Sequence, residues 1–221
     1  MEIVTTILSP HKSVRTHKID RLTVHCVVGQ CTAEALGNWF ANPQTKASSN
    51  YGVDKDGRVG LYVPENERSW CSSNTANDDR AITIECASDT YDPYVFTESC
   101  YQGLISLCVD ICKRYGKKKL LWLEDKETTE AYQPKDDEMV ISLHRWYANK
   151  QCPGQWFVDR LPEFVKEVTA RLEAPSAWAK ESCEKAVKKG IVQGYGDGTY
   201  GWQDNITREQ MIVILDRLGL I

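Results

Sequence analysis

Three short apolar runs constrain the fold of this chain more than any other feature. Residues 22–28, 81–87 and 139–144 have the length and the β-branched or aliphatic composition of β-strands. Side chains alternate between the two faces of a strand. Each run therefore has one continuous apolar face, and its opposite face carries at least one polar side chain. If the three strands share one sheet, their polar side chains converge on one face of it.

Amphipathic helices are predicted between and after these strands. Thr32 is the expected N-cap of a helix that ends near residues 42–43, and Thr97 that of a helix that ends near Tyr115. Residues 153–172 carry apolar side chains at helical spacing. Strands interspersed with helices predict an α/β domain.

The remaining segments of this domain are expected to be less regular. Residues 51–59 predict a hairpin with the dipeptide 56–57, Asp-Gly, at its turn. Residues 1–20, 64–80 and 124–138 have the composition of irregular or polar loops. Long loops within compact domains are often functional.

A break at residues 173–175 divides the chain into two parts. We place the larger domain at residues 1–172 and a second, small helical module at residues 176–221. About 45 residues of helix, turn and helix are marginal for an independent core, so the second module is expected to need a partner surface.

The second module has its own helix signals. Ser176 is predicted to cap a first helix that closes at Gly190, and a glycine- and tyrosine-rich turn follows at residues 194–202. Thr207 and Gln210 then form the capping box of a last helix.

Composition narrows the class of function. The chain has 221 residues and a net charge of −4, without the basic excess that a nucleic-acid partner requires. No apolar run approaches the ~18 residues of a membrane span, and residues 1–6 show no secretory signal.

Nine cysteines without a compact spacing pattern predict reduced thiols in an intracellular chain. Three of them fall at helical core positions, namely Cys100, Cys108 and Cys112.

One segment, residues 142–154, concentrates groups that can do chemistry. His144 and Cys152 offer an imidazole and a thiolate, which are both zinc ligands, and Lys150 offers a fixed positive charge beside them. Pro153 is predicted to lie in the first turn of the helix that follows.

Alternation along the strands adds His25 and Glu85 to this group. A catalytic zinc ion needs about three protein ligands and an open position for water. That count is met by His25, His144 and Cys152. Glu85 would then be the general base and Lys150 the group that stabilises an oxyanion, so the predicted reaction class is hydrolysis of an amide.

Each of these residues also has a structural interpretation. A single strand histidine such as His25 is more often a half-buried packing residue than a ligand, and Glu85 can pair with a surface cation. Tyr51 alone is more simply a packing aromatic residue. A cysteine hydrolase, with Cys152 as nucleophile beside His144, is a further alternative.

Several motifs in fixed order resemble one enzyme family, the zinc-dependent N-acetylmuramoyl-L-alanine amidases of the peptidoglycan-recognition and phage-lysozyme type. The motifs are residues 22–25, 49–57, 68–71, 82–85 and 144–154. The set is specific although no single motif is. The resemblance implies a central mixed β-sheet flanked by helices and a zinc ion in a surface groove. It also implies cleavage of the amide between N-acetylmuramic acid and L-alanine in peptidoglycan.

By position, the resemblance assigns the zinc ligands to His25, His144 and Cys152. Lys150 matches the lysine that stabilises the tetrahedral oxyanion in this family.

Two residues compete for the role of assisting the water. Tyr51 matches a tyrosine found across the groove in the phage branch, and Glu85 matches the glutamate that serves as base in the bacterial branch. Trp70 and Trp146 are candidate walls for the substrate. Cys71 stands where the family often has histidine, and this departure removes none of the three ligands.

Residues 176–221 resemble a single S-layer-homology module. The matching stretches are residues 177–179, 190–200 and 206–210. Such modules anchor proteins to secondary cell-wall polymers and usually occur in threes, so a single copy implies weak binding or a homo-oligomer. Arg208 is the candidate contact with an anionic polymer, and a helix-terminal charge without a ligand is the alternative.

A wall hydrolase with a wall-targeting module and no predicted secretory signal resembles a phage or prophage endolysin. Such a protein is expected in the host bacterial cytoplasm until a holin opens the membrane, and at the cell wall afterwards. A peptidoglycan-binding protein of the same fold without catalysis is the alternative. Such relatives lose a zinc ligand, and the presence of Cys152 argues against this.

Overall fold

The computed structural model describes residues 1–195, 199–202 and 204–221. The chain forms two compact units, Met1–Thr169 and Ala170–Ile221. The division falls within helix α6 (Leu161–Glu173). Among the described residues, no helix combines the length and the apolar content that crossing a membrane requires.

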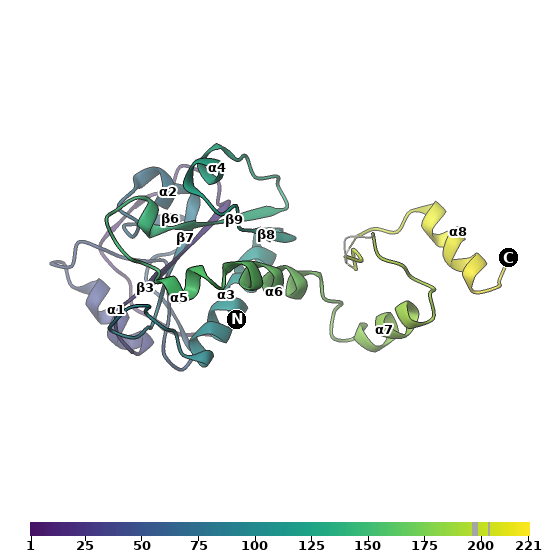
Figure 1. Cartoon of the computed structure of the whole chain (residues 1–221), viewed down its shortest axis with the longest axis horizontal. Helices are drawn as coiled ribbons and strands as arrows, with labels where there is room; N and C mark the ends of the chain where they lie inside the picture. Colours follow the sequence, from purple (N-terminus) through teal and green to yellow (C-terminus); the bar gives the residue numbers. More distant parts are fainter. Residues whose placement is uncertain (196–198, 203) are drawn as a thin grey trace. The chain divides into compact units, whose positions relative to one another are not determined.

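The first unit is built on a seven-stranded sheet flanked by helices (Figure 1). Its strands lie in the order β1 (Ile3–Thr6), β5 (Val59–Leu61), β4 (Tyr51–Val53), β7 (Ala81–Cys86), β3 (Arg21–Cys26), β9 (Glu138–Leu143) and β8 (Lys119–Leu121). Neighbouring strands are parallel except in the β4–β5 hairpin. The sheet is therefore mixed, and the predicted α/β class is confirmed.

The three apolar runs form the centre of this sheet, as strands β7, β3 and β9 side by side. The segments expected to be irregular contain short elements that the prediction missed. These are β1, β2 (Lys12–Val14), β6 (Glu67–Ser69), α2 (Thr75–Arg80) and α4 (Lys126–Ala131). Strands β2 and β6 pair with each other in a separate antiparallel sheet. The missed strands have three or four residues, too few to show alternation, and the missed helices have six, fewer than two helical turns.

Two predicted helix caps are confirmed. Thr32 caps α1 (Ala33–Ala41) and Thr97 caps α3 (Glu98–Arg114), each by accepting a backbone N–H three residues on. The cysteines of α3 belong to the core, since Cys100, Cys108 and Cys112 are each 0% exposed. Cys100 contacts Cys86 of β7, so α3 covers the apolar face of the central strands.

The segment after residue 153 forms two helices, α5 (Gln155–Val158) and α6. The predicted position of Pro153 is wrong, because the helix begins after it. Gly154 occupies the N-cap with a φ of 97°, a value that favours glycine. Residues 152–153 form a turn, so the candidate ligand Cys152 lies directly before Gly154 and α5.

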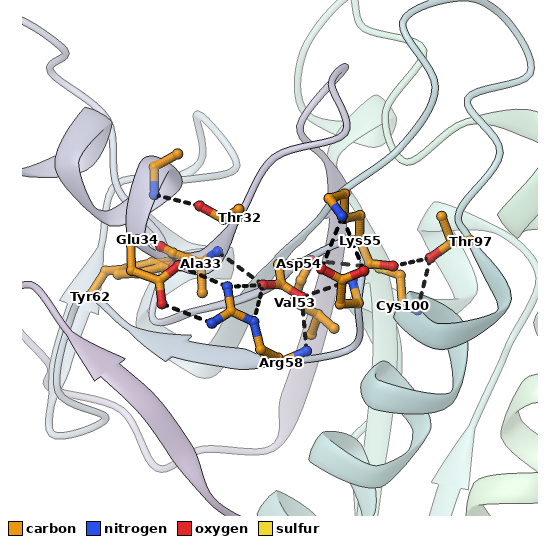
Figure 2. Close-up of polar contacts among 12 residues, drawn as sticks. Thr32, Ala33, Glu34, Val53, Asp54, Lys55, Arg58, Tyr62, Thr97 and Cys100 are labelled. Atoms are coloured by element: carbon orange, nitrogen blue, oxygen red, sulfur yellow. Dashed lines mark hydrogen bonds and ion pairs between the residues drawn. The ribbon is translucent and has the colours of Figure 1, made fainter.

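The predicted hairpin is confirmed, and a buried carboxylate joins it to α1 (Figure 2). Asp54 accepts the backbone N–H groups of Ala33, Asp56 and Arg58 at 2.9–3.2 Å. The Arg58 guanidinium bonds Asp54 and also pairs with Glu34 of α1. These bonds satisfy an anion that would otherwise be costly to bury.

The polar face of the central strands is covered by α2. The hydroxyl oxygens of Thr23 on β3 and Ser142 on β9 are 2.7 Å apart, and both form hydrogen bonds with the side-chain amide of Asn77 on α2. Further along the same strands, His25 is in register with Glu85 of β7. Residues in register share a face, so the sheet brings this histidine and this glutamate together on the side of α2.

The second unit contains helices α7 (Lys180–Lys188) and α8 (Arg208–Arg217). The predicted cap at Ser176 is wrong: a turn over residues 177–179 comes first, and Ala179 occupies the N-cap without a side-chain bond. The capping box of Thr207 and Gln210 is confirmed.

Parts of the glycine- and tyrosine-rich turn, residues 196–198, lie outside the described residues. No residue of α7 or α8 is buried.

Candidate metal centre

Two adjacent parallel strands bring the predicted histidines together. His25 lies at the end of β3, and His144 follows β9 directly, with their Nδ1 atoms 3.1 Å apart. The chain then returns to the same place, because the backbone N–H of Cys26 donates to Cys152 Sγ at 3.3 Å. A hydrogen bond from Arg145 N–H to the carbonyl of Cys152 closes this segment.

These three residues fit a zinc ion in number, type and spacing. One donor atom from each of His25, His144 and Cys152 lies within 4.8 Å of the others. Two nitrogens that bind one tetrahedral zinc at about 2.0–2.1 Å lie about 3.4 Å apart, close to the 3.1 Å between the two Nδ1 atoms. His25 is 0% exposed, and its Nδ1 faces the Nδ1 of His144, so the two rings present one nitrogen each to the same place.

The electrostatics of the cluster favour neutral histidines. Burial, together with His144, holds the pKa of His25 well below its usual value. Burial and the Lys150 ammonium lower the pKa of His144. Both rings are therefore neutral at pH 7, the state in which imidazole binds a metal. Burial and the neighbouring Cys26 thiol raise the pKa of Cys152, so a thiolate here requires a cation beside it.

Glu85 lies next to this cluster on the same face of the sheet. Burial raises the pKa of its carboxyl to about 7. Its Oε1 is 3.8 Å from Cys71 Sγ, and its buried Oε2 has no partner among the described residues. A second set of donors, from His25, Cys71 and Glu85, also lies within 4.8 Å.

Cys71 is the residue that the sequence reasoning left without a role. Its signals in the sequence were its position directly after Trp70 in the motif of residues 68–71 and the histidine that the family often has there. That position gives no indication that the thiol reaches Glu85, because the contact depends on how the loop folds back onto β7.

A surface groove of about 570 Å³ opens beside the cluster. Its lining includes Glu85, His144, Lys150, Trp70 and Cys71. Trp70 is 40% exposed, its ring packs against His11 at 5.5 Å, and its Nε1 donates to Ser13 Oγ. The groove therefore has a fixed aromatic wall and an exposed ammonium beside the histidines.

The structure does not bring Tyr51 to this site. Tyr51 is in register with Ile84 of β7, whereas its neighbour Gly52 is in register with Glu85. The tyrosine therefore points to the opposite face, where its hydroxyl donates to Glu65 Oε1 at 2.9 Å. Burial and this carboxylate raise the pKa of the phenol.

Two other predicted contacts have different surroundings. Trp146 is absent from the described groove lining and stacks on Trp122, with ring centroids 5.6 Å apart. Arg208 is the first residue of α8, in the second unit. That unit has a cavity of about 490 Å³. Its described lining includes the stacked rings of Tyr200 and Trp202 but does not include Arg208.

The mixed sheet, the His–His–Cys cluster and the groove define an α/β protein with a metal-type site at the surface. Residues 15–155 match the family model described as N-acetylmuramoyl-L-alanine amidase, and the chain belongs to this family. Residues 174–212 match the model of the S-layer homology domain.

Solved structures share the fold of the first unit. PlyL is 18% identical, with a TM-score of 0.54 over 76% of this chain and 97% of that one. A selenomethionine derivative of AmpD is 21% identical, with a TM-score of 0.52 over 75% and 96%. A mutant endolysin from Bacillus subtilis is 17% identical, with a TM-score of 0.51 over 76% and 99%.

One curated protein is similar over a short segment. The outer membrane protein SlpA of Deinococcus radiodurans is 34% identical over 58 residues, which make up 26% of this chain. This chain spans 5% of the length of that curated relative.

Proposed function

We propose that the protein is a zinc-dependent peptidoglycan hydrolase that cleaves the amide between N-acetylmuramic acid and L-alanine. The observation that carries this proposal is the cluster of His25, His144 and Cys152 beside a groove in an amidase fold. Two neutral imidazoles and one thiolate leave a zinc ion with a net charge of +1 and room for further ligands.

The residues around the cluster divide the chemistry between them. Bound zinc supplies Lewis-acid chemistry, which lowers the pKa of water and polarises a carbonyl. Glu85 accepts the proton of the attacking water at Oε2, an atom without a hydrogen-bond partner among the described residues, and delivers it to the leaving nitrogen. The Lys150 ammonium, exposed in the groove, stabilises the negative charge that develops on the carbonyl oxygen.

The groove binds the substrate along its length. Trp70 provides the aromatic wall, since it lies in the groove lining with its ring orientation fixed by His11 and Ser13. Trp146, which stacks on Trp122, has no part in this proposal.

The second unit directs the enzyme to the cell wall. Its match to the S-layer homology domain supports binding of a secondary cell-wall polymer, with Arg208 as an exposed cationic contact. The absence of buried residues in α7 and α8 supports assembly of several chains through this module.

The biological role that we propose is that of a phage or prophage endolysin. Similarity of fold to PlyL and to the B. subtilis endolysin supports this role. The enzyme would remain in the host cytoplasm until a holin opens the membrane, and would then digest the wall.

Digestion of purified cell walls tests the reaction. We expect release of new L-alanine amino termini without new reducing sugars, loss of this release with a chelator, and recovery with added zinc. His144→Ala should abolish it, whereas His17→Ala, a change at an exposed histidine outside the cluster, should not. Reducing sugars without amino termini would indicate a glycosidase and contradict the proposal.

The same assay separates the two alternatives. A cysteine hydrolase would keep its activity in chelator and lose it on alkylation of Cys152. A protein that only binds peptidoglycan would be folded, bind walls, contain no zinc and release no product.

A further inference from the structure

A second group of metal-type donors adjoins the first and extends to Cys71. Donor atoms of His25, Cys71 and Glu85 lie within 4.8 Å of one another. The group combines one nitrogen, one sulfur and one oxygen donor, a set that suits zinc and similar borderline cations. It shares His25 with the first cluster.

The position of Cys71 is fixed by two neighbouring segments. The Asp78 carboxylate of α2 accepts the backbone N–H groups of Cys71 and Ser72 at 3.1–3.2 Å. Trp70, the preceding residue, exchanges hydrogen bonds with Ser48 through its backbone N–H and carbonyl. The loop therefore holds the thiol against Glu85 without help from a bound ion.

Two buried polar atoms of this group point to a ligand. His25 is 0% exposed, and in the described residues its Nε2 has no hydrogen-bond partner. The same holds for Glu85 Oε2. Buried polar atoms are nearly always paired, so two unpaired ones in a single group call for a partner outside the protein.

Charge and access also suit a dication. A thiolate at Cys71 and a carboxylate at Glu85 together balance a charge of +2, which offsets the cost of burying the ion. Both residues line the groove, so an ion can enter from solvent.

We propose that His25, Cys71 and Glu85 form a second zinc-type site, adjacent to the first and sharing the imidazole of His25. A neutral imidazole binds one ion through its single free lone pair, whereas an imidazolate can bridge two, so binding of the second ion releases the N–H proton of His25 to solvent. The Nδ1 of His25 faces His144, which leaves Nε2 for the second ion.

The consequence for catalysis rests on the proposed function. With the second ion bound, Glu85 is a metal ligand and no longer accepts a proton from water. Amidase activity is therefore highest with one equivalent of zinc and falls when excess zinc fills the second site.

Equilibrium dialysis of the metal-free full chain against graded zinc, followed by elemental analysis, measures the number of ions bound. We expect two equivalents for the unaltered protein and one for Cys71→Ser. Cys183→Ser, which removes a thiol of the second unit outside both groups, should still bind two. Cobalt titration gives a second readout, because the near-ultraviolet thiolate-to-cobalt band should gain a second step that Cys71→Ser lacks.

Circular dichroism verifies that each variant folds. If Cys71→Ser is unfolded, Glu85→Gln replaces it, with one equivalent expected. Saturation of the unaltered protein at one equivalent, with Cys71→Ser unchanged from it, would overturn the inference. Failure of the proposed function looks different, since two ions would still bind while walls released no amino termini at any zinc concentration.

Discussion

Replacing Tyr51 with phenylalanine should weaken the fold and leave catalysis intact. The lost hydroxyl donates to Glu65, which also accepts from Arg114 and Tyr115. A hydrogen bond to a charged group contributes about 1.5–3 kcal/mol. Because Glu65 keeps its other donors, we expect the lower end of this range, about 1.5 kcal/mol, or roughly a tenfold change in the folding equilibrium.

Urea unfolding and the initial rate of amino-terminus release, measured on the same preparations, test this expectation. Tyr132→Phe is the matched control, since it removes a similar bond to Glu138 at a less buried site and should cost less. A turnover reduced tenfold or more in Tyr51→Phe, with unchanged stability, would refute the reasoning. It would mean that the hydroxyl reaches the reacting atoms from what is here the opposite face of the sheet.

Two further predictions concern carboxylates. Glu85→Gln should lower turnover by about 10²–10⁴-fold, the usual contribution of a general base, while the first equivalent of zinc still binds. Wall digestion measures the turnover, and zinc analysis measures the bound metal. Burial alone would raise the pKa of Glu65, but bonds from Arg114 and its other donors outweigh burial and hold this pKa below the usual value. The stability it contributes is therefore present above the unfolded-state pKa of about 4.3 and is lost as the pH falls through the folded-state pKa. Glu65→Gln should be less stable at pH 7 and should show a flatter acid limb in unfolding measurements from pH 7 to pH 3.

Element length decided how much of the fold the sequence could predict. Helix α3 has 17 residues and presents its apolar stripe several times, so periodicity located the helix, and the N-cap preference of threonine located its start at Thr97. Strands β2, β6 and β8 have three residues each, too few to display alternation. Pairing with distant strands, rather than local preference, makes them strands.

The candidate site was predictable to the extent that it depends on alternation within strands. His25 is the histidine in the run at residues 22–28 and Glu85 is the carboxylate in the run at residues 81–87, each on the face opposite the apolar one. Their common face followed from alternation once the two strands share a sheet. Cys71 was not predictable, because its position depends on hydrogen bonds from its loop to Asp78. Family position alone suggested Tyr51 for the groove, and the register of β4 contradicts it.

That register is set by a residue with no side chain. Gly52 shares its face with Glu85, and a Cβ at Gly52 would lie 2.6 Å from Leu36 Cδ2 and 2.7 Å from Tyr62 Cε2. A slip of one residue would put the side chain of Tyr51 into this space, against the core of α1, so packing forbids it. Glycine at position 52 therefore decides which of the two candidate bases can reach the metal cluster. It keeps Tyr51 on the far face of the sheet and leaves Glu85 as the carboxylate beside His25.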